Sequence, residues 1–234
     1  DGTASGTVMV KDINSVSSSS GLNYLTAVGN TLYFRADDGI NGGELWKSDG
    51  TASGTVMVKN IRSGSSSGSS IKYITAIGNT LYFSASDGTN GEELWKSDGT
   101  ASGTVMVKDI RVPSGSSSPT LLTAVGNTLY FQADDGTNGY ELWKSDGTAS
   151  GTVMVKDINS GSNSGSPSTL TAVGNTLYFT ADDGTNGREL WKSDGTTSGT
   201  VMVKHIYSGS SSSSPSHFTA VGNTLYFGAN DGGT

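Results

Sequence analysis

Short apolar runs alternate with polar segments along the whole chain. In the first full copy of the pattern, the runs cover residues 25–28 (LTAV), 31–34 (TLYF), 44–47 (ELWK) and 55–58 (TVMV). Each run has the length and the β-branched and aromatic content of a short β-strand. The pattern therefore predicts four β-strands in each copy.

The segments between the runs have the composition of tight turns. Gly29 and Asn30 join the first two runs, "DDGING" (37–42) joins the next two, and "SDGTASG" (48–54) joins the last two. Glycine and asparagine tolerate the positive φ that tight hairpins require, and Asp-Gly is a strong hairpin signal. Because short hairpins join antiparallel neighbours, we expect each copy to form a four-stranded antiparallel meander. A polar crossover, such as residues 159–168, then leads to the next copy.

The pattern repeats with a nearly constant period. Successive copies begin 48 or 49 residues apart, at Asp1, Asp49, Asp98, Asp146 and Asp194. Runs such as LYF and VMV are apolar at consecutive positions, which fits strands covered on both faces, so the copies are expected to stack on one another. Four strands per repeat of this length are typical of a β-propeller blade. We therefore predict an all-β fold, with a single tandem-repeat β-propeller domain over residues 1–234 and about five blades.

The last blade is incomplete in the sequence. Residues 1–10 supply an outer strand without the three strands that normally precede it, and residues 218–227 supply two inner strands without a following ELWKS run. We expect these two parts to form one blade that is shared between the N- and C-termini and lacks its third strand. Three explanations are open: a segment of a longer protein, a ring with one defective blade, or oligomerisation in which a neighbouring chain completes the blade by strand addition.

Composition and charge exclude several classes of partner and chemistry. The chain has 21 acidic and 14 basic residues and a net charge of −7, whereas nucleic-acid binding normally requires a basic stripe. There is no cysteine, so disulfides, thiolate metal sites and cysteine nucleophiles are excluded. No apolar run approaches the ~20 residues of a membrane helix, so we expect no membrane span.

The octapeptide ELWKSDGT (44–51) returns unchanged at 93–100, 141–148 and 189–196. On these four copies the chain resembles the bacterial ELWxxDGT repeat family. The resemblance implies tandem, propeller-like repeats in large exported bacterial proteins, with no established enzymatic role and no catalytic residues. We therefore expect an extracellular or cell-surface location. The sequence shows no acidic dyad or Ser-His pair at a convincing spacing, which also favours a protein that is not an enzyme.

Comparison of the copies separates a uniform face from a variable one. The first and third turns of each meander are nearly identical between copies, whereas positions at the opposite strand ends differ. The variable positions precede LTAV (Tyr24, Tyr73, Leu121, Thr169, His217), follow TLYF (Arg35, Ser84, Gln132, Thr180, Gly228), precede ELW (Gly43, Glu92, Tyr140, Arg188) and follow TVMVK (Asp12, Asn60, Asp109, Asp157, His205). We expect these four sets to converge on one surface.

Binding diversity usually accumulates in the loops of a rigid scaffold. The first hypothesis is therefore a binding or adhesion module whose variable face binds a glycan, another surface polymer or other protein subunits. Its candidate ligand-binding residues are Tyr24, Arg35, Tyr73, Glu92, Gln132, Tyr140, Arg188, His205 and His217. The alternative is neutral drift at exposed positions in a purely structural module of a matrix, filament or oligomer.

Three recurring residue types have simpler interpretations. Asp37, Asp38, Asn41 and Glu44 could supply oxygen ligands to calcium, but the Asp-Gly and Asn-Gly pairs already account for a turn, so we predict no cofactor. The tryptophan of each ELW and the methionine of each TVMV are interpreted as packing residues. The lysine after each TVMV is interpreted as an edge residue that discourages sheet aggregation.

Overall fold

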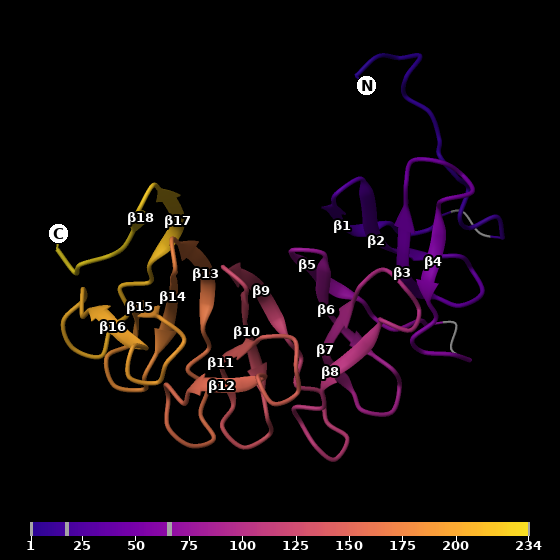
Figure 1. Ribbon diagram of the computed structural model, residues 1–234. Helices are drawn as coiled ribbons and strands as arrows, with labels where there is room; N and C mark the ends of the chain where they lie inside the picture. Colours follow the sequence, from indigo (N-terminus) through magenta and orange to yellow (C-terminus); the bar gives the residue numbers. More distant parts are fainter. Residues whose placement is uncertain (1, 17–18, 65–66, 234) are drawn as a thin grey trace. The chain divides into compact units, whose positions relative to one another are not determined.

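The computed structural model describes residues 2–16, 19–64 and 67–233, and this part of the chain is all-β (Figure 1). The strands are β1 (Asn23–Val28), β2 (Thr31–Asp37), β3 (Gly43–Ser48), β4 (Val56–Lys59), β5 (Lys72–Ile77), β6 (Thr80–Ser86), β7 (Glu92–Ser97), β8 (Val105–Lys108), β9 (Thr120–Val125), β10 (Thr128–Asp134), β11 (Tyr140–Ser145), β12 (Val153–Lys156), β13 (Ser168–Val173), β14 (Thr176–Asp182), β15 (Arg188–Ser193), β16 (Val201–Lys204), β17 (Ser216–Val221) and β18 (Thr224–Gly228). Within the described residues, no helix that could span a membrane is found.

The strands form four four-stranded sheets in chain order and one two-stranded sheet. The orders are β1-β2-β3-β4, β5-β6-β7-β8, β9-β10-β11-β12 and β13-β14-β15-β16, followed by β17-β18. The recorded strand pairs are antiparallel, as in β1–β2, β2–β3 and β3–β4. This is the meander of a β-propeller blade, so the predicted fold class is confirmed. We call the four-stranded sheets the first to fourth blades.

One predicted boundary changes the interpretation of the variable positions. The TLYF strand was expected to end at Phe34, but β2 continues to Asp37 and pairs with β3 along its whole length, from Leu32 opposite Ser48 to Asp37 opposite Gly43. Arg35 and its counterparts therefore lie inside a paired strand and not in a loop. Their backbone is held by the sheet, which gives their side chains a defined direction.

The sharing of the last blade between the two termini stays a prediction, because the two terminal parts belong to different compact units of the chain. β17 and β18 form a sheet of two strands, and residues 7–10 belong to no strand. The N-terminal segment contacts the first blade, because Lys11 Nζ donates a 2.7 Å hydrogen bond to the Thr55 carbonyl and Ile13 packs against the apolar residues of that blade. Lys59 bonds the Thr104 carbonyl in the same way, so the segment occupies the position of an outer strand preceding the first blade.

The chain divides into two compact units. The first consists of Asp1–Thr89 and Trp95–Val105, and the second of Asn90–Leu94 and Met106–Thr234. The second blade contributes residues to both units. The single-domain organisation stays a prediction.

Within the second unit, apolar side chains of the third blade pack against those of the fourth. One buried cluster contains Tyr130, Leu142 and Val155 from the third blade together with Phe179 and Trp191 from the fourth. The four ELW tryptophans are 5–7% exposed, which confirms their packing role. Stacking explains the consecutive apolar residues, because both faces of these sheets lose contact with water.

The glutamate of ELW joins each blade to the crossover that follows it. Glu44 is fully buried, and its carboxylate accepts hydrogen bonds from the Ile61 N–H at 3.0 Å and the Ser69 hydroxyl at 2.7 Å. Ile61 follows β4 and Ser69 precedes β5. One carboxylate therefore holds both ends of a crossover whose Ser- and Gly-rich sequence has little apolar surface to bury.

The remaining polar residues of ELWKSDGT form the turn and the contact with the next copy. Asp49 Oδ1 accepts from the Thr51 N–H at 2.9 Å and the Thr51 hydroxyl at 2.7 Å, and the Thr51 hydroxyl accepts from the Gly54 N–H at 2.9 Å. Lys47 Nζ donates to the Gly99 carbonyl in the next copy at 2.9 Å. The octapeptide is therefore used for packing, turn formation and contact between copies.

The lysines after TVMV do more than protect an edge. Lys59, Lys108 and Lys156 each donate a hydrogen bond of 2.7–2.9 Å to a threonine carbonyl in the following copy. The ammonium of Lys156 also lies 5.6 Å from the centroid of the Trp191 ring, within the range of a cation–π interaction. These lysines connect successive copies, a role that their position after the outer strand did not indicate.

Candidate binding face

The second residue of each inner strand has a strained backbone, at the same position of the repeat. Asn23 pairs with Arg35 and Thr26 with Tyr33, so Tyr24 and Leu25 together oppose Phe34 in a β-bulge. The first bulged residue has a left-handed backbone in all five copies: Tyr24 (φ 56°), Tyr73 (56°), Leu121 (59°), Thr169 (55°) and His217 (56°). This conformation costs a non-glycine residue about 1 kcal/mol or more. These are the variable residues that precede LTAV.

The bulges place three of the four variable sets next to one another. The residue after TLYF is the cross-strand partner of the residue before the bulge, as in Asn23–Arg35 and Lys72–Ser84. The residue before ELW lies diagonally opposite the residue after TLYF in the β2–β3 hairpin, since Asp37 pairs with Gly43 and Arg35 with Leu45. Within a blade these three sets therefore lie next to one another, and we call their positions together the variable face. Convergence of all copies on one surface stays a prediction.

The fourth set does not join the variable face. These residues follow the outer strand, at the far side of each sheet from the inner strand. Asn60 Nδ2 donates to Asn41 Oδ1 at 2.7 Å, and His205 Nε2 lies 2.9 Å from the Gly209 carbonyl in its own loop. His205 is therefore separated by the width of a blade from the candidates on the inner strands.

Two arginines reach equivalent places from different strands. Arg35 on β2 donates from Nη1 to the Gly21 carbonyl at 3.3 Å, and Arg188 on β15 donates from Nη1 to the Ser166 carbonyl at 2.8 Å. Gly21 and Ser166 occupy the same repeat position, and both have a left-handed backbone. A Cβ at Gly43 would overlap the Arg35 guanidinium, so residues 35 and 43 are sterically coupled.

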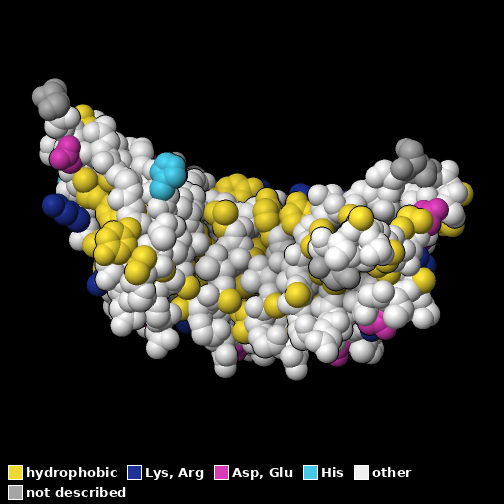
Figure 2. Space-filling view, turned by 90° about the horizontal axis from the view of Figure 1, so that it is seen from above, with side chains coloured by type: hydrophobic (Ala, Val, Ile, Leu, Met, Phe, Trp, Pro, Cys, Tyr) yellow, Lys and Arg dark blue, Asp and Glu magenta, His cyan; other side chains and the backbone are white. Residues whose placement is uncertain are grey.

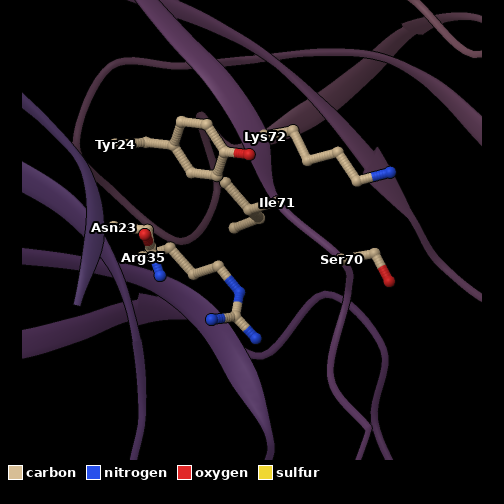
Figure 3. A pocket seen from close by; sticks show the side chains of 6 residues that line it. All are labelled: Asn23, Tyr24, Arg35, Ser70, Ile71 and Lys72. Carbon is tan, nitrogen blue, oxygen red and sulfur yellow. The ribbon is translucent and has the colours of Figure 1, made fainter. Parts of the chain in front are cut away.

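In the first unit, the variable face contains a pocket of about 310 Å³ (Figure 3). Its lining residues are Asn23, Tyr24, Arg35, Ser70, Ile71 and Lys72. In Figure 3 the ring of Tyr24 and the guanidinium of Arg35 border one side of the pocket, and Ser70 lies across from them. The ammonium of Lys72 extends away from the Arg35 guanidinium.

The pocket is flanked by an exposed aromatic pair. The ring centroids of Tyr24 and Tyr73 lie 5.9 Å apart at an interplanar angle of 54°, and the residues are 39% and 37% exposed. Hydrophobic side chains also lie in separate patches on the surface seen in Figure 2, most of which is formed by uncharged groups. The first unit therefore presents two aromatic rings beside a cationic pocket.

The other candidates lie in the second unit, where most have partners within their own blade. Gln132 Oε1 accepts from the Thr120 hydroxyl at 3.0 Å, and Arg188 also donates to Ser168 and Thr180. The backbones of Glu92 and Tyr140 bond the following crossovers, and His217 Nδ1 lies 3.0 Å from the Ser216 hydroxyl. The described residues of the second unit thus include variable positions of the same backbone geometry but no counterpart of the tyrosine pair.

Four lining residues of the pocket were not among the sequence candidates: Asn23, Ser70, Ile71 and Lys72. Asn23 and Lys72 differ between copies (Thr120, Ser168 and Ser216 are their counterparts), so a comparison extended by one residue would have found them. Ser70 precedes β5 by two residues, and only the folded crossover brings it to the pocket.

The "DDGTNG"-type segments form hydrogen-bonded turns. Asp38 Oδ1 accepts from the backbone N–H groups of Ile40 and Asn41, at 2.9 and 2.7 Å. Partial burial opposes ionisation, but these bonds outweigh it and hold the pKa of Asp38 below its usual value. Among the described residues, no group of three or more His, Asp or Glu side chains is placed to hold a metal ion. Calcium binding stays a question for experiment.

The fold and this face define a tandem-repeat protein built from β-propeller blades. No protein-family model matches the chain. A search of curated proteins gives no match. Among solved structures, the chain is similar to one from a study of two prolyl endopeptidases, with 17% identity and a TM-score of 0.48. The similarity covers 74% of this chain and 24% of that one, so it spans about a quarter of the enzyme chain.

Proposed function

We propose that the protein is a non-catalytic binding module of the bacterial cell surface or extracellular space, and that its variable face binds a saccharide polymer. The observation that carries this proposal is the Tyr24–Tyr73 pair beside the pocket. Tyrosine presents an apolar ring with a hydroxyl at its edge, which suits the mixed C–H and O–H surface of a sugar. The resemblance to the ELWxxDGT repeats supports the location.

Backbone strain at the same residues supports the proposal. Tyr24 and Tyr73 have φ values of 56°, a conformation that glycine would adopt without penalty. A bulge directs a side chain away from the regular pleat, and strained residues cluster at binding sites. The bulge therefore fixes the backbone from which each ring projects before a ligand arrives, which lowers the entropic cost of binding.

The test uses substitutions that the repeat itself contains. Leu121 and Thr169 stand at the same bulge position, so Tyr24→Leu and Tyr73→Thr place residues that this backbone accepts. A glycan array followed by titration calorimetry should show saccharide binding by the parent and a loss of roughly tenfold or more in the double variant. Absence of binding by the parent, or equal binding by the variant, contradicts the proposal.

The second candidate is a purely structural module that assembles with other subunits. It is favoured by the exposure of Tyr226 (60%) and Phe227 (38%) on β18, whereas the equivalent Tyr82 and Phe83 are buried. An edge strand with exposed aromatic residues, such as β18 beside β17, can accept a further strand. Ordered polymerisation without any saccharide, measured by sedimentation velocity, would favour this candidate over the first.

A further inference from the structure

Arg35 has an unusual environment for a partly buried cation. A guanidinium carries five N–H donors in a fixed fork, and the structure gives this one a single hydrogen bond of 3.3 Å, to the Gly21 carbonyl. No acidic side chain in the described part of the chain pairs with it. By contrast, Arg111 forms a 2.5 Å ion pair with Asp134. This bond is exposed to solvent, so most of the hydrogen-bonding capacity of Arg35 is available to a ligand.

The first blade provides the space for this guanidinium. Glu92, Tyr140 and Arg188 occupy the position of Gly43 in the later copies. A Cβ at Gly43 would overlap the guanidinium. The arginine at position 35 and the glycine at position 43 therefore act together, and this combination occurs in the first blade only.

The rest of the pocket suits one sugar residue that carries an acidic group. A volume of about 310 Å³ is at the small end of ligand pockets. Tyr24 offers a ring face, Ser70 offers a hydroxyl across from it, and Lys72 adds positive charge to the lining although it also has an interaction within the protein. Because the protein has a net charge of −7, attraction of an anion has to come from local positive charge, chiefly that of Arg35.

We infer that the pocket selects an acidic saccharide. The Arg35 fork binds the sugar carboxylate through two parallel N–H···O bonds, while Tyr24 and Tyr73 contact the rings of that sugar and its neighbour. This inference rests on the proposed saccharide-binding role and adds the chemical class of the ligand.

The experiment compares a trimer of galacturonic acid with the matching neutral galactose trimer by titration calorimetry. The parent should bind the acidic trimer roughly tenfold more tightly or better, and this preference should fall at high salt. Arg35→Gln, which copies Gln132 of the third blade, should abolish the preference for the acidic trimer. Lys192→Gln, an exposed lysine on β15, makes the same change in net charge and should have no effect.

A second variant separates the position of the guanidinium from its charge. Gly43→Ala displaces the Arg35 side chain and keeps its charge, so it should also reduce the preference for the acidic trimer. If Gly43→Ala binds both trimers like the parent, the position of the Arg35 guanidinium does not determine the preference. Equal affinity of the parent for both trimers overturns the inference but leaves the proposed function. If the parent binds neither trimer and no saccharide of the array, both the inference and the proposed function are overturned. Thermal melting of each variant checks that the fold is retained.

Discussion

Glu93 Oε2 accepts a 2.6 Å hydrogen bond from the hydroxyl of Ser117, 24 positions later in the chain, and both side chains are fully buried. The same pair exists as Glu44–Ser69 and Glu189–Ser213. The third blade differs, because Gly165 stands where the serine would be and Glu141 accepts only backbone N–H groups in this region. The four copies thus provide a natural comparison of one buried carboxylate with and without a hydroxyl donor.

Stability should depend on pH through Glu141. Burial raises its pKa to about 7, although the N–H groups of Ile158 and Gly165 favour the charged form. Between the ordinary value near 4.5 and about 7, the folded state holds a proton that the unfolded state releases. The free energy of unfolding should therefore fall as pH rises through this window, by on the order of 1–3 kcal/mol.

Urea unfolding followed by tryptophan fluorescence at several pH values measures this dependence. In Glu141→Gln, the free energy of unfolding should vary less with pH between 4.5 and 7. It should also be lower than in the parent by a constant amount, because the N–H groups of the new amide face backbone N–H donors. Burial also raises the pKa of Glu44 and Glu93, so part of the slope should remain. A variant with the same slope as the parent contradicts the assignment.

Removal of the hydroxyl at Ser117 should destabilise the second crossover. Ser117→Ala leaves Glu93 with backbone N–H donors only, as at Glu141, and a hydrogen bond to a charged group contributes about 1.5–3 kcal/mol. The loss in unfolding free energy should be larger above pH 7 than at pH 5, where the carboxyl group is closer to neutral. Ser162→Ala, at an exposed serine of the third crossover, is the control. Equal losses of unfolding free energy in Ser117→Ala and Ser162→Ala would show that the buried hydrogen bond does not contribute to stability.

Thr169 should be replaceable by glycine with a gain in stability. It is exposed, β-branched and left-handed at φ 55°, so relief of strain should exceed the entropy that glycine loses on folding. We expect Thr169→Gly to raise the free energy of unfolding by roughly 0.5–1 kcal/mol. Thr171→Gly, two residues later in the same strand and opposite Tyr178, should instead lower it by about the same amount. Destabilisation by both variants would mean that the bulge is not strained.

Asp49 and Gly54 should act as one unit in the third turn. A Cβ at Gly54 would overlap the Asp49 carboxylate, which accepts the N–H and hydroxyl of Thr51. Those bonds, the hydroxyl first, also hold the pKa of Asp49 below its usual value. Gly54→Ala should therefore lower the melting temperature about as much as Asp49→Ala, and the double variant should lower it little further. Additive losses would show that the glycine has a separate role.

Calcium should not change the melting temperature. The Oδ1 atoms of Asp38, Asp135 and Asp183 each accept two backbone N–H groups, and the glutamates that follow are buried in the crossover network. A cation would have to displace these bonds to collect the six or more oxygens that calcium favours. Scanning calorimetry with a chelator and then with excess calcium tests this, with magnesium as the control. A saturable rise in melting temperature with calcium alone would identify a site that the turns conceal.

Much of the fold could be predicted because its strongest signals are local. LTAV, TLYF, ELWK and TVMV have strand composition, the segments between them have hairpin composition, and short hairpins leave only antiparallel neighbours. The stacking of copies followed from consecutive apolar residues. Tyr24, Arg35 and Tyr73 could be selected as candidates because they differ between otherwise identical copies.

The sequence by itself therefore determined the strands, their order in each blade and the variable positions, since these depend on residues close together in the chain. Only the tertiary structure showed that the N-terminal segment covers the first blade, that a left-handed bulge presents Tyr24, and that Gly43 makes room for Arg35. The same holds for the lysines, whose acceptors lie about 44 positions away in the next copy. These features arise from contacts between residues far apart in the chain. Register, backbone strain and steric exclusion determine these contacts, and they cannot be predicted from local composition.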